Sequence, residues 1–196
     1  MKRIKFIQHN QINKTKWDLC MDKSINRSVY GLSWYLDIVA KKWDALIYGD
    51  YELIFPLTYK YYIPYIPFLK SLSQPVFCQQ LGAFSPNAEL LGHQDLIRGI
   101  LFFLKKHYLT LHYSLNHSVS LKYHEYIVKH KLLFSTVSRV NLELDLSLDY
   151  NQLYEKYNNN TKRNLNKRLN YYINEIYDVS NFVNFLKNYL PTIVNL

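Results

Sequence analysis

The sequence predicts a mixed α/β fold, and three patterns lead to that prediction. Two strand-like runs, residues 45–48 and 51–58, flank the dipeptide Gly49-Asp50, which is typical of a tight hairpin. A helical pattern over residues 87–106 separates further strand-like segments. Residues 140–146 alternate regularly between apolar and polar side chains. Strands that are separated by helical patterns favour an α/β or mixed-sheet architecture.

The N-terminal part of the chain predicts one strand and two helices. Residues 5–12 are expected to form the first strand. Over residues 14–25 the apolar side chains recur at helical spacing, which predicts an amphipathic helix. Ser33 is the expected N-cap of a second helix, with Tyr35 and Ile38 along one side.

Proline complicates the next segment. Pro56 interrupts the second hairpin strand and indicates an edge position or a bulge, because proline cannot donate a ladder hydrogen bond. Residues 60–72 are rich in tyrosine and proline and are expected to form an irregular loop. Its aromatic side chains either form a rim for a ligand or fold onto the core as a lid. The lid is favoured, since aromatic rings usually bury large areas.

The stretch PVFCQQLGAFSP, residues 75–86, is the centre of the predicted organisation. Its apolar residues predict a buried strand that leads into the helix over residues 87–106. Gln79 and Gln80 interrupt this apolar run, and a buried amide without partners costs about 1–3 kcal/mol. The two side chains therefore either brace the core or face a cleft. The step from strand to helix at residues 81–87 is also where open α/β sheets bind ligands.

Further elements follow this stretch. The helix over residues 87–106 is expected to bury one apolar stripe, made of Leu96, Ile97, Ile100, Leu101 and Leu104. Residues 109–115 alternate as a strand does, and residues 140–146 show the clearest alternation in the chain. Both segments are therefore predicted to be strands.

A basic stretch begins after Tyr154. Between Glu155 and Glu175 the chain has no acidic residue but five Lys or Arg. Thr161 is the expected N-cap of a helix there, which places Lys162 and Arg163 where a phosphate can bind. The alternative is a solvated helix face. Residues 181–190 begin another helical pattern.

The composition is that of a globular protein with an anionic partner. The chain has 196 residues, of which 48% are hydrophobic, enough for a core. The net charge of +9 favours a phosphorylated small molecule, nucleic acid or an anionic membrane surface as partner. The N-terminus lacks the apolar core of a signal peptide, and no apolar run approaches about 18 residues. A cytoplasmic protein without a membrane span is therefore expected.

No complete catalytic or metal-binding motif is recognisable. The cysteines and histidines lack the spacing of metal ligands, so no metal site is predicted. No nucleophile–base pattern or P-loop occurs. One short match does occur. Residues 79–84 fit four positions of the Q/R-x-x-G-x-G/A turn with which GNAT-superfamily acyl-CoA transferases hold pyrophosphate, although Phe84 stands where that turn has a small residue.

Several short motifs occur in an order and spacing that resemble a known family. They are WD (17–18), VYGLSWYLD (29–37), WDAL (43–46), FPLT (55–58), QQLG (79–82) and NTKRN (160–164). As a set they resemble the FemAB-like proteins of the GNAT superfamily found in Bacteroidetes, over about residues 4–190. The resemblance implies a GNAT-like lobe over residues 1–160, with a mostly antiparallel sheet flanked by helices. Residues 161–196 would form a helical connector and a fragment of a second GNAT-like lobe.

The resemblance also implies a function. It implies a lobe of an acyl- or aminoacyl-transferase that binds an anionic, phosphate- or nucleotide-linked acceptor in cell-wall precursor or polysaccharide modification. The donor would be acyl-CoA or aminoacyl-tRNA. The expected binding residues are Trp34 and Tyr35 as walls, Gln79 and Gln80 on the cleft floor, and Lys162 and Arg163 for phosphate. No catalytic residue is assigned.

Two other functions stay open. The chain is alternatively a non-enzymatic module that binds nucleic acid or an anionic surface, or an inactive, truncated product. Residues 182–196 are rich in apolar side chains, and exposed apolar patches mark interfaces. This segment is therefore expected to pack onto the first lobe, to form a homodimer, or to be disordered.

Overall fold

The computed structural model describes residues 2–40, 42–62, 69–142, 144 and 147–166. The chain divides into two compact units, Met1–Asn141 and Leu142–Leu196. The boundary predicted after residue 160 therefore falls inside the second unit.

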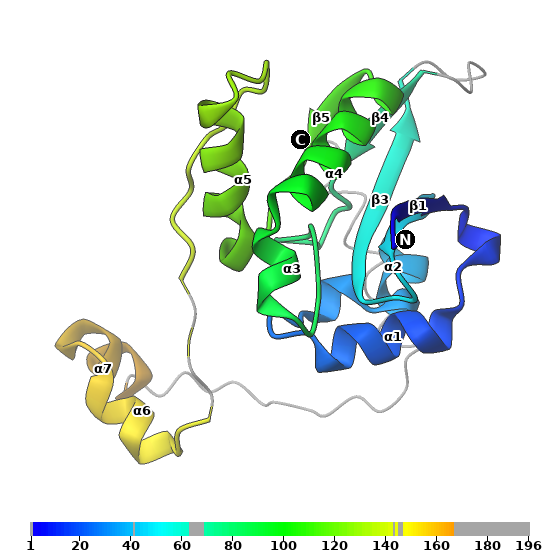
Figure 1. Cartoon of the computed structure of the whole chain (residues 1–196). Helices are drawn as coiled ribbons and strands as arrows, with labels where there is room; N and C mark the ends of the chain where they lie inside the picture. Colours follow the sequence, from blue (N-terminus) through cyan, green and yellow to red (C-terminus); the bar gives the residue numbers. More distant parts are fainter. Residues whose placement is uncertain (1, 41, 63–68, 143, 145–146, 167–196) are drawn as a thin grey trace. The chain divides into compact units, whose positions relative to one another are not determined.

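A five-stranded mixed sheet forms the centre of the first unit (Figure 1). Its strands are β1 (Ile4–Ile7), β2 (Trp43–Tyr48), β3 (Leu53–Tyr61), β4 (Lys70–Ser73) and β5 (Thr110–His112). They lie in the order of the sequence, and neighbours are antiparallel except for the parallel pair β4–β5. The predicted mixed α/β fold, with a mostly antiparallel sheet flanked by helices, is confirmed at this level.

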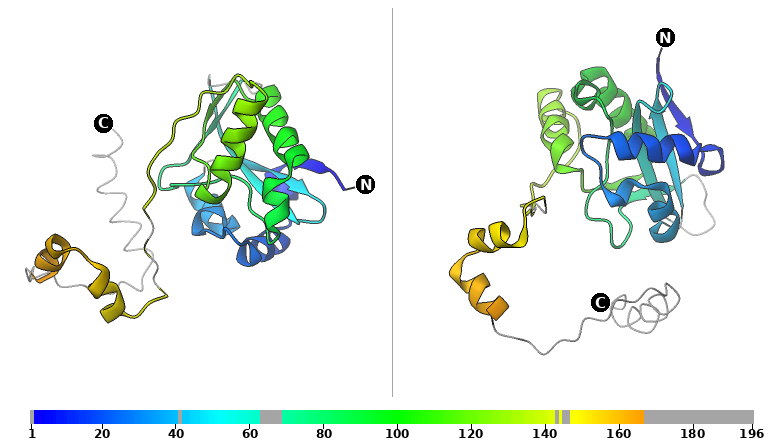
Figure 2. Two further views of the ribbon diagram at one scale, coloured as in Figure 1. Left: turned by 60° about the vertical axis from the view of Figure 1, so that its left-hand side comes forward. Right: turned by 90° about the horizontal axis from the view of Figure 1, so that it is seen from below.

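Helices cover both faces of the sheet. Helices α1 (Lys14–Lys23) and α2 (Ser33–Val39), with the short 3-10 helices η1 (His9–Gln11) and η2 (Val29–Gly31), belong to the segment before β2. Helices α3 (Ala88–Gly92) and α4 (Gln94–His107) connect β4 to β5, and α5 (His117–Lys129) follows β5. Figure 2 shows the sheet between these two groups of helices.

Two apolar clusters follow from the alternation of side chains along the strands. Ile54 of β3 packs with Trp17 of α1 and Leu36 of α2. Its neighbour Phe55 points to the other face and packs with Ile97 and Ile100 of α4. The stripe predicted for the long helix is buried throughout, so this part of the core follows from helical periodicity alone.

Asparagine side chains begin three of these helices. Asn13, Asn87 and Asn116 accept hydrogen bonds from backbone N–H groups in the first turns of α1, α3 and α5. Ser33, by contrast, is not the N-cap of α2, because Leu32 occupies that position. The backbone N–H and hydroxyl of Ser33 instead donate to the carboxylate of Asp18 at 2.7 Å each. These bonds attach the start of α2 to α1.

At Pro56, β3 pairs with β2 alone, so the predicted edge position is correct locally, although β3 is an inner strand of the sheet. Pro56 is opposite Ala45 of β2, whereas β4 pairs with β3 only at residues 59–61. The carbonyl of Pro56 accepts a 2.6 Å hydrogen bond from the Tyr113 hydroxyl, on the side where β4 is absent. Because the N–H and C=O of one strand residue face the same side, the missing N–H of proline leaves no ladder bond unmade.

The strand predicted between residues 75 and 86 is wrong in its position. The structure instead has its strand earlier in the chain, as β4, which begins inside the segment that was expected to be an irregular loop. Strand β3 also extends into that segment, as far as Tyr61. Residues 63–68 of the expected lid lie outside the described residues. Residues 74–80 leave the sheet, and only Leu81 and Phe84 return to it, as isolated bridges to Leu115 and Ile54.

The alternating segment over residues 140–146 is not a strand where the structure describes it. Residues 140–142 and 144 pair with no other strand, and Val140 and Leu142 are each 90% exposed. Alternation favours a strand only where a neighbouring strand and a surface to cover are available. The local pattern was clear, but the tertiary partner is missing among the described residues.

The described part of the second unit contains two helices, α6 (Tyr150–Lys156) and α7 (Asn159–Asn166). Asp149 and Gln152 form a capping box at the start of α6. Asn158, rather than Thr161, caps α7, since its side chain accepts the Thr161 N–H at 2.8 Å. The predictions for residues 181–196 lie outside the described residues. No described helix has the length and apolar character needed to cross a membrane.

Candidate functional site

The sheet opens at the carboxyl ends of its parallel strands. Strands β4 and β5 pair as far as Ser73 and His112, and their continuations meet again only at Leu81 and Leu115. Between these points residues 74–80, here called the β4 loop, project from the sheet. Ligands of sheets with parallel strands usually bind beyond the carboxyl ends of the strands. The β4 loop therefore marks the first candidate site.

Gln74 holds the β4 loop in place. Its backbone N–H donates to the carbonyl of His112 at 3.0 Å. Its side-chain Oε1 accepts from the N–H of Ser114, and its Nε2 donates to the carbonyl of Cys78, both at 2.9 Å. The amide of Gln74 thus replaces the ladder that is lost where the strands separate. Sequence reasoning missed this residue, because it lies just outside the stretch that was singled out.

Gln79 and Gln80 lie at the far end of the same loop. The Oε1 atom of Gln80 accepts the backbone N–H of His117 at 3.1 Å, at the first residue of α5. Gln79 is exposed. Of the two alternatives, bracing applies to Gln80, whereas Gln79 presents its amide to the surface.

Aromatic side chains from α2 meet the β4 loop. The hydroxyl of Tyr35 donates to the carbonyl of Phe77 at 2.9 Å, and the Tyr35 ring makes an edge contact with Trp34. Trp34 and Phe77 remain 52% and 55% exposed. Ile38, four residues after Trp34, and Val76, next to Phe77, are also exposed. We call Trp34, Ile38, Val76 and Phe77 the exposed apolar residues of the site. Phe77 has a positive φ of 72°, so the β4 loop holds this ring outward at a conformational cost.

The carboxylate of Asp37 on α2 has three hydrogen-bond partners, and Asp37 directly precedes Ile38, one of the exposed apolar residues of the site. Asp37 Oδ1 is 2.8 Å from His9 Nε2 and accepts from Trp43 Nε1 at 3.1 Å, and Oδ2 accepts from Lys14 Nζ at 2.6 Å. Partial burial opposes ionisation, but the bonds from Lys14, His9 and Trp43 outweigh it and lower the pKa of Asp37. A carboxylate that orients an imidazole in this way is the arrangement of a general base.

A second carboxylate is close to the same histidine. Asp44 is buried, accepts the backbone N–H of His9 at 3.1 Å, and lies 3.8 Å from Lys70 Nζ. Lys70 in turn lies over the ring of Tyr59, 4.1 Å from its centroid. Burial and then the charge of Asp44 raise the pKa of Tyr59 to about 12. Asp44 therefore holds the backbone of His9, and Asp37 contacts its ring.

Backbone donors of the turn over residues 79–84 make hydrogen bonds within the fold. The N–H groups of Leu81 and Phe84 donate to the carbonyls of Ser114 and Ile54 at 2.9 Å each. Helix α3 begins only at Ala88, and Asn87 already caps it. Two of the donors that a Q/R-x-x-G-x-G/A turn would direct at a phosphate are therefore already used within the fold.

Lys162 and Arg163 lie on α7 in the second unit. Lys162 Nζ donates to the carbonyl of Glu155 at 3.2 Å and is 3.7 Å from its carboxylate. Arg163 donates to the side chain of Asn160 at 2.9 Å. Both predicted phosphate ligands thus have partners within their own unit.

The comparisons with known proteins add no family. No protein-family model matches the sequence, and neither a curated protein nor a solved structure matches it. Among the described residues, no group of three His, Cys, Asp or Glu side chains is arranged to hold a metal ion. The function must therefore be argued from the site alone.

Proposed function

We propose that the first unit is the acceptor-binding lobe of an acyl- or aminoacyl-transferase, similar to the FemAB-like proteins, and that its acceptor carries a phosphate or a nucleotide. One observation carries the proposal. Trp34, Tyr35, Gln79 and Gln80, which were selected from the sequence, gather around the β4 loop at the carboxyl ends of β4 and β5. This is the place where a sheet with parallel strands takes a ligand.

The chemistry of the surroundings suits such an acceptor. Trp34 and Phe77 are exposed rings, and exposed rings of this kind can stack on the flat face of a nucleotide base. The positive charge also belongs to this unit, since residues 1–141 contain 18 Lys and Arg against 9 Asp and Glu. Residues 142–196 contain six of each, so they contribute no net charge. An anionic acceptor is therefore attracted to the first unit.

The His9–Asp37 pair is the candidate proton acceptor. Acyl transfer to an amine requires the acceptor to be oriented and its proton to be removed as the bond forms. His9 is held by Asp37 through one ring nitrogen, and its other ring nitrogen has no hydrogen-bond partner among the described residues. The donor, acyl-CoA or aminoacyl-tRNA, has no assigned residues.

Titration calorimetry tests the proposal with UDP-linked muropeptides and CoA thioesters as ligands. We expect the UDP-linked ligand to bind, and Trp34→Ala to weaken that binding about tenfold or more through the lost stacking. Phe102→Ala is the matched control, because Phe102 is also an exposed ring, 68% exposed against 52% for Trp34, but lies on α4. If neither ligand class bound measurably, or if Trp34→Ala and Phe102→Ala bound the UDP-linked ligand equally well, the proposed acceptor site would be excluded.

Non-enzymatic binding to nucleic acid is the second candidate, and the concentration of charge in the first unit favours it. Binding to DNA or RNA should weaken steeply as salt is raised, because counterions are released from the polyanion. A UDP-linked ligand with few charges should show a much shallower dependence. The two slopes, measured on the same protein, separate the two functions.

A further inference from the structure

We propose that an open groove between α4, α5 and β5 binds a single-chain amphiphile with an anionic head group, such as a fatty acid or an alkyl phosphate. The chain would lie along the apolar floor and the head group would contact Lys105. The transfer reaction proposed above does not need this ligand, so the two proposals stand or fall separately.

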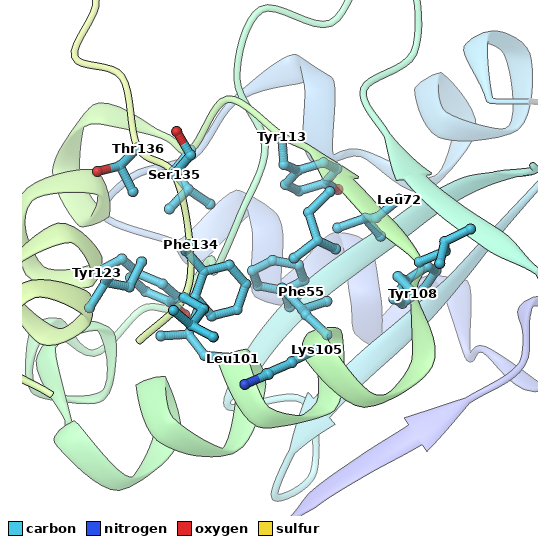
Figure 3. Close-up of a pocket in the computed structure, with 16 residues that line it drawn as sticks. Phe55, Leu72, Leu101, Lys105, Tyr108, Tyr113, Tyr123, Phe134, Ser135 and Thr136 are labelled. Carbon is cyan, nitrogen blue, oxygen red and sulfur yellow. The ribbon is translucent and has the colours of Figure 1, made fainter. Parts of the chain in front are cut away.

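The floor of the groove is apolar. The groove has a volume of about 390 Å³, within the range of about 300–1,000 Å³ that is common for ligand sites. The sheet supplies Phe55, Leu72 and Leu111, and the helices supply Leu101 and Ile127. Figure 3 shows the rings of Phe55, Tyr123 and Phe134 along the same hollow. An alkyl chain placed there loses contact with water along its length.

One wall of the groove is formed by residues that follow α5 in the sequence. Leu133, Phe134, Ser135 and Thr136 line it. Leu133 lines the groove yet is 88% exposed. A ligand in the groove would therefore cover part of the Leu133 side chain.

The rim is cationic, and this selects the head group. Lys105 is the one charged residue among those that line the groove, and it has no acidic partner among the described residues. Figure 3 shows its amine at the edge of the hollow, near Leu101. An apolar floor beneath such a rim is complementary to a chain that ends in a carboxylate or phosphate.

Calorimetry below the critical micelle concentration tests the proposal. The probes are octanoate, decanoate, dodecanoate, dodecyl phosphate and the uncharged dodecanol. We expect each pair of added methylene groups to tighten binding about tenfold. We also expect both dodecyl anions to bind more tightly than dodecanol. Binding that does not depend on chain length would overturn the proposal.

Two pairs of variants locate the site. Lys105→Gln should weaken dodecanoate about three- to tenfold and leave dodecanol unchanged, whereas Lys106→Gln, a neighbouring residue outside the lining, should change neither. Ser135→Trp should fill the groove and abolish binding, while Ser138→Trp, at another exposed position of the same segment, should not. Equal affinities within either pair would contradict the assignment.

Light scattering distinguishes the remaining occupant, a second copy of the chain. If the groove were an interface between copies, wild-type protein would be dimeric, Ser135→Trp would be monomeric, and dodecanoate would not bind. That result would overturn the proposal. A monomer that binds dodecanoate but neither UDP-linked muropeptides nor CoA thioesters would support the groove and exclude the transferase.

Discussion

The hydroxyl of Tyr113 donates a hydrogen bond of 2.6 Å to the carbonyl of Pro56, and so joins the end of β5 to the middle of β3. Strand β4 would normally separate these two residues, but the β4 loop has already left the sheet at this level. The ring of Tyr113 stacks on Phe55, with centroids 5.8 Å apart, and packs against both apolar clusters. Tyr113 therefore closes the opening that the β4 loop leaves.

Replacing Tyr113 by phenylalanine tests this role. The variant keeps the stacked ring but leaves the Pro56 carbonyl without its donor, so we expect the free energy of unfolding to fall by about 1–2 kcal/mol. Urea unfolding at neutral pH measures the difference. Tyr35→Phe is the control, because it removes a hydroxyl bond at an exposed position and should cost less than about 1 kcal/mol. Equal costs for the two variants would contradict the role of Tyr113.

Gly31 is the point at which η2 comes closest to Met21 of α1. A Cβ atom at this position would overlap the end of the Met21 side chain and lie 3.0 Å from Phe84, and both neighbours are buried. We expect Gly31→Ala to lower the free energy of unfolding by about 1–3 kcal/mol through overpacking. At Gly92 the nearest atom is Lys122 Nζ at 3.3 Å, the end of a flexible side chain. Gly92→Ala should therefore be nearly neutral in the same thermal or urea unfolding experiment.

Because of Asp37, the free energy of unfolding should vary with pH in the acidic range. The pKa of Asp37 is lowered in the folded protein, so its contribution is present above the ordinary value of 3.8 and is lost as the pH falls through the folded value. We expect Asp37→Asn to cost about 1–2 kcal/mol at pH 6, and the difference from wild type to shrink below pH 3.8.

The matched control for this prediction is Asp22→Asn, an exposed position on α1 with no hydrogen-bond partner among the described residues. Its effect at pH 6 should be within about 0.5 kcal/mol of zero. A wild-type advantage over Asp37→Asn that persists unchanged at pH 3 would show that the ionised carboxylate is not responsible.

Both thiols should be unreactive in the folded protein. Burial raises the pKa of Cys20 and of Cys78 to about 11, from an ordinary value of 9.0. At pH 8 this lowers the thiolate fraction about 100-fold, and the thiolate is the reactive form. Reaction with a disulfide reagent should therefore be at least about 100-fold slower in native protein than in urea. One thiol that reacts rapidly in native protein would identify a residue that is not packed as described.

Parts of the fold could be predicted because they depend on local periodicity. The five apolar residues of α4 recur at helical spacing and are all buried. The hairpin of β2 and β3 follows from Gly49, which has a positive φ of 63° between two apolar runs. In both cases residues that are near in sequence determine the conformation, so no knowledge of the distant chain is needed.

The site was predictable only in outline. Trp34 and Tyr35 could be singled out by their motif, and Gln79 and Gln80 by their polarity within an apolar run. The bracing amide of Gln74 and the His9–Asp37 pair had no such signal, because their types and spacing match no motif. His9 and Asp37 are 28 positions apart and come from η1 and α2. Only the packing of these helices against β2 brings them together.

The sequence by itself determined α1, the buried stripe of α4 and the place where the hairpin turns, since these properties depend on contacts over a few residues. It did not indicate α5 or α6. Tertiary structure alone decided which strand-like segments join the sheet. Residues 70–73 became a strand because β3 and β5 flank them, whereas residues 140–142 have no neighbouring strand among the described residues. Strand formation requires hydrogen bonds to a partner, and that partner is set by the fold rather than by the segment. The contact of Tyr113 with Pro56 spans 57 positions and shows the same dependence.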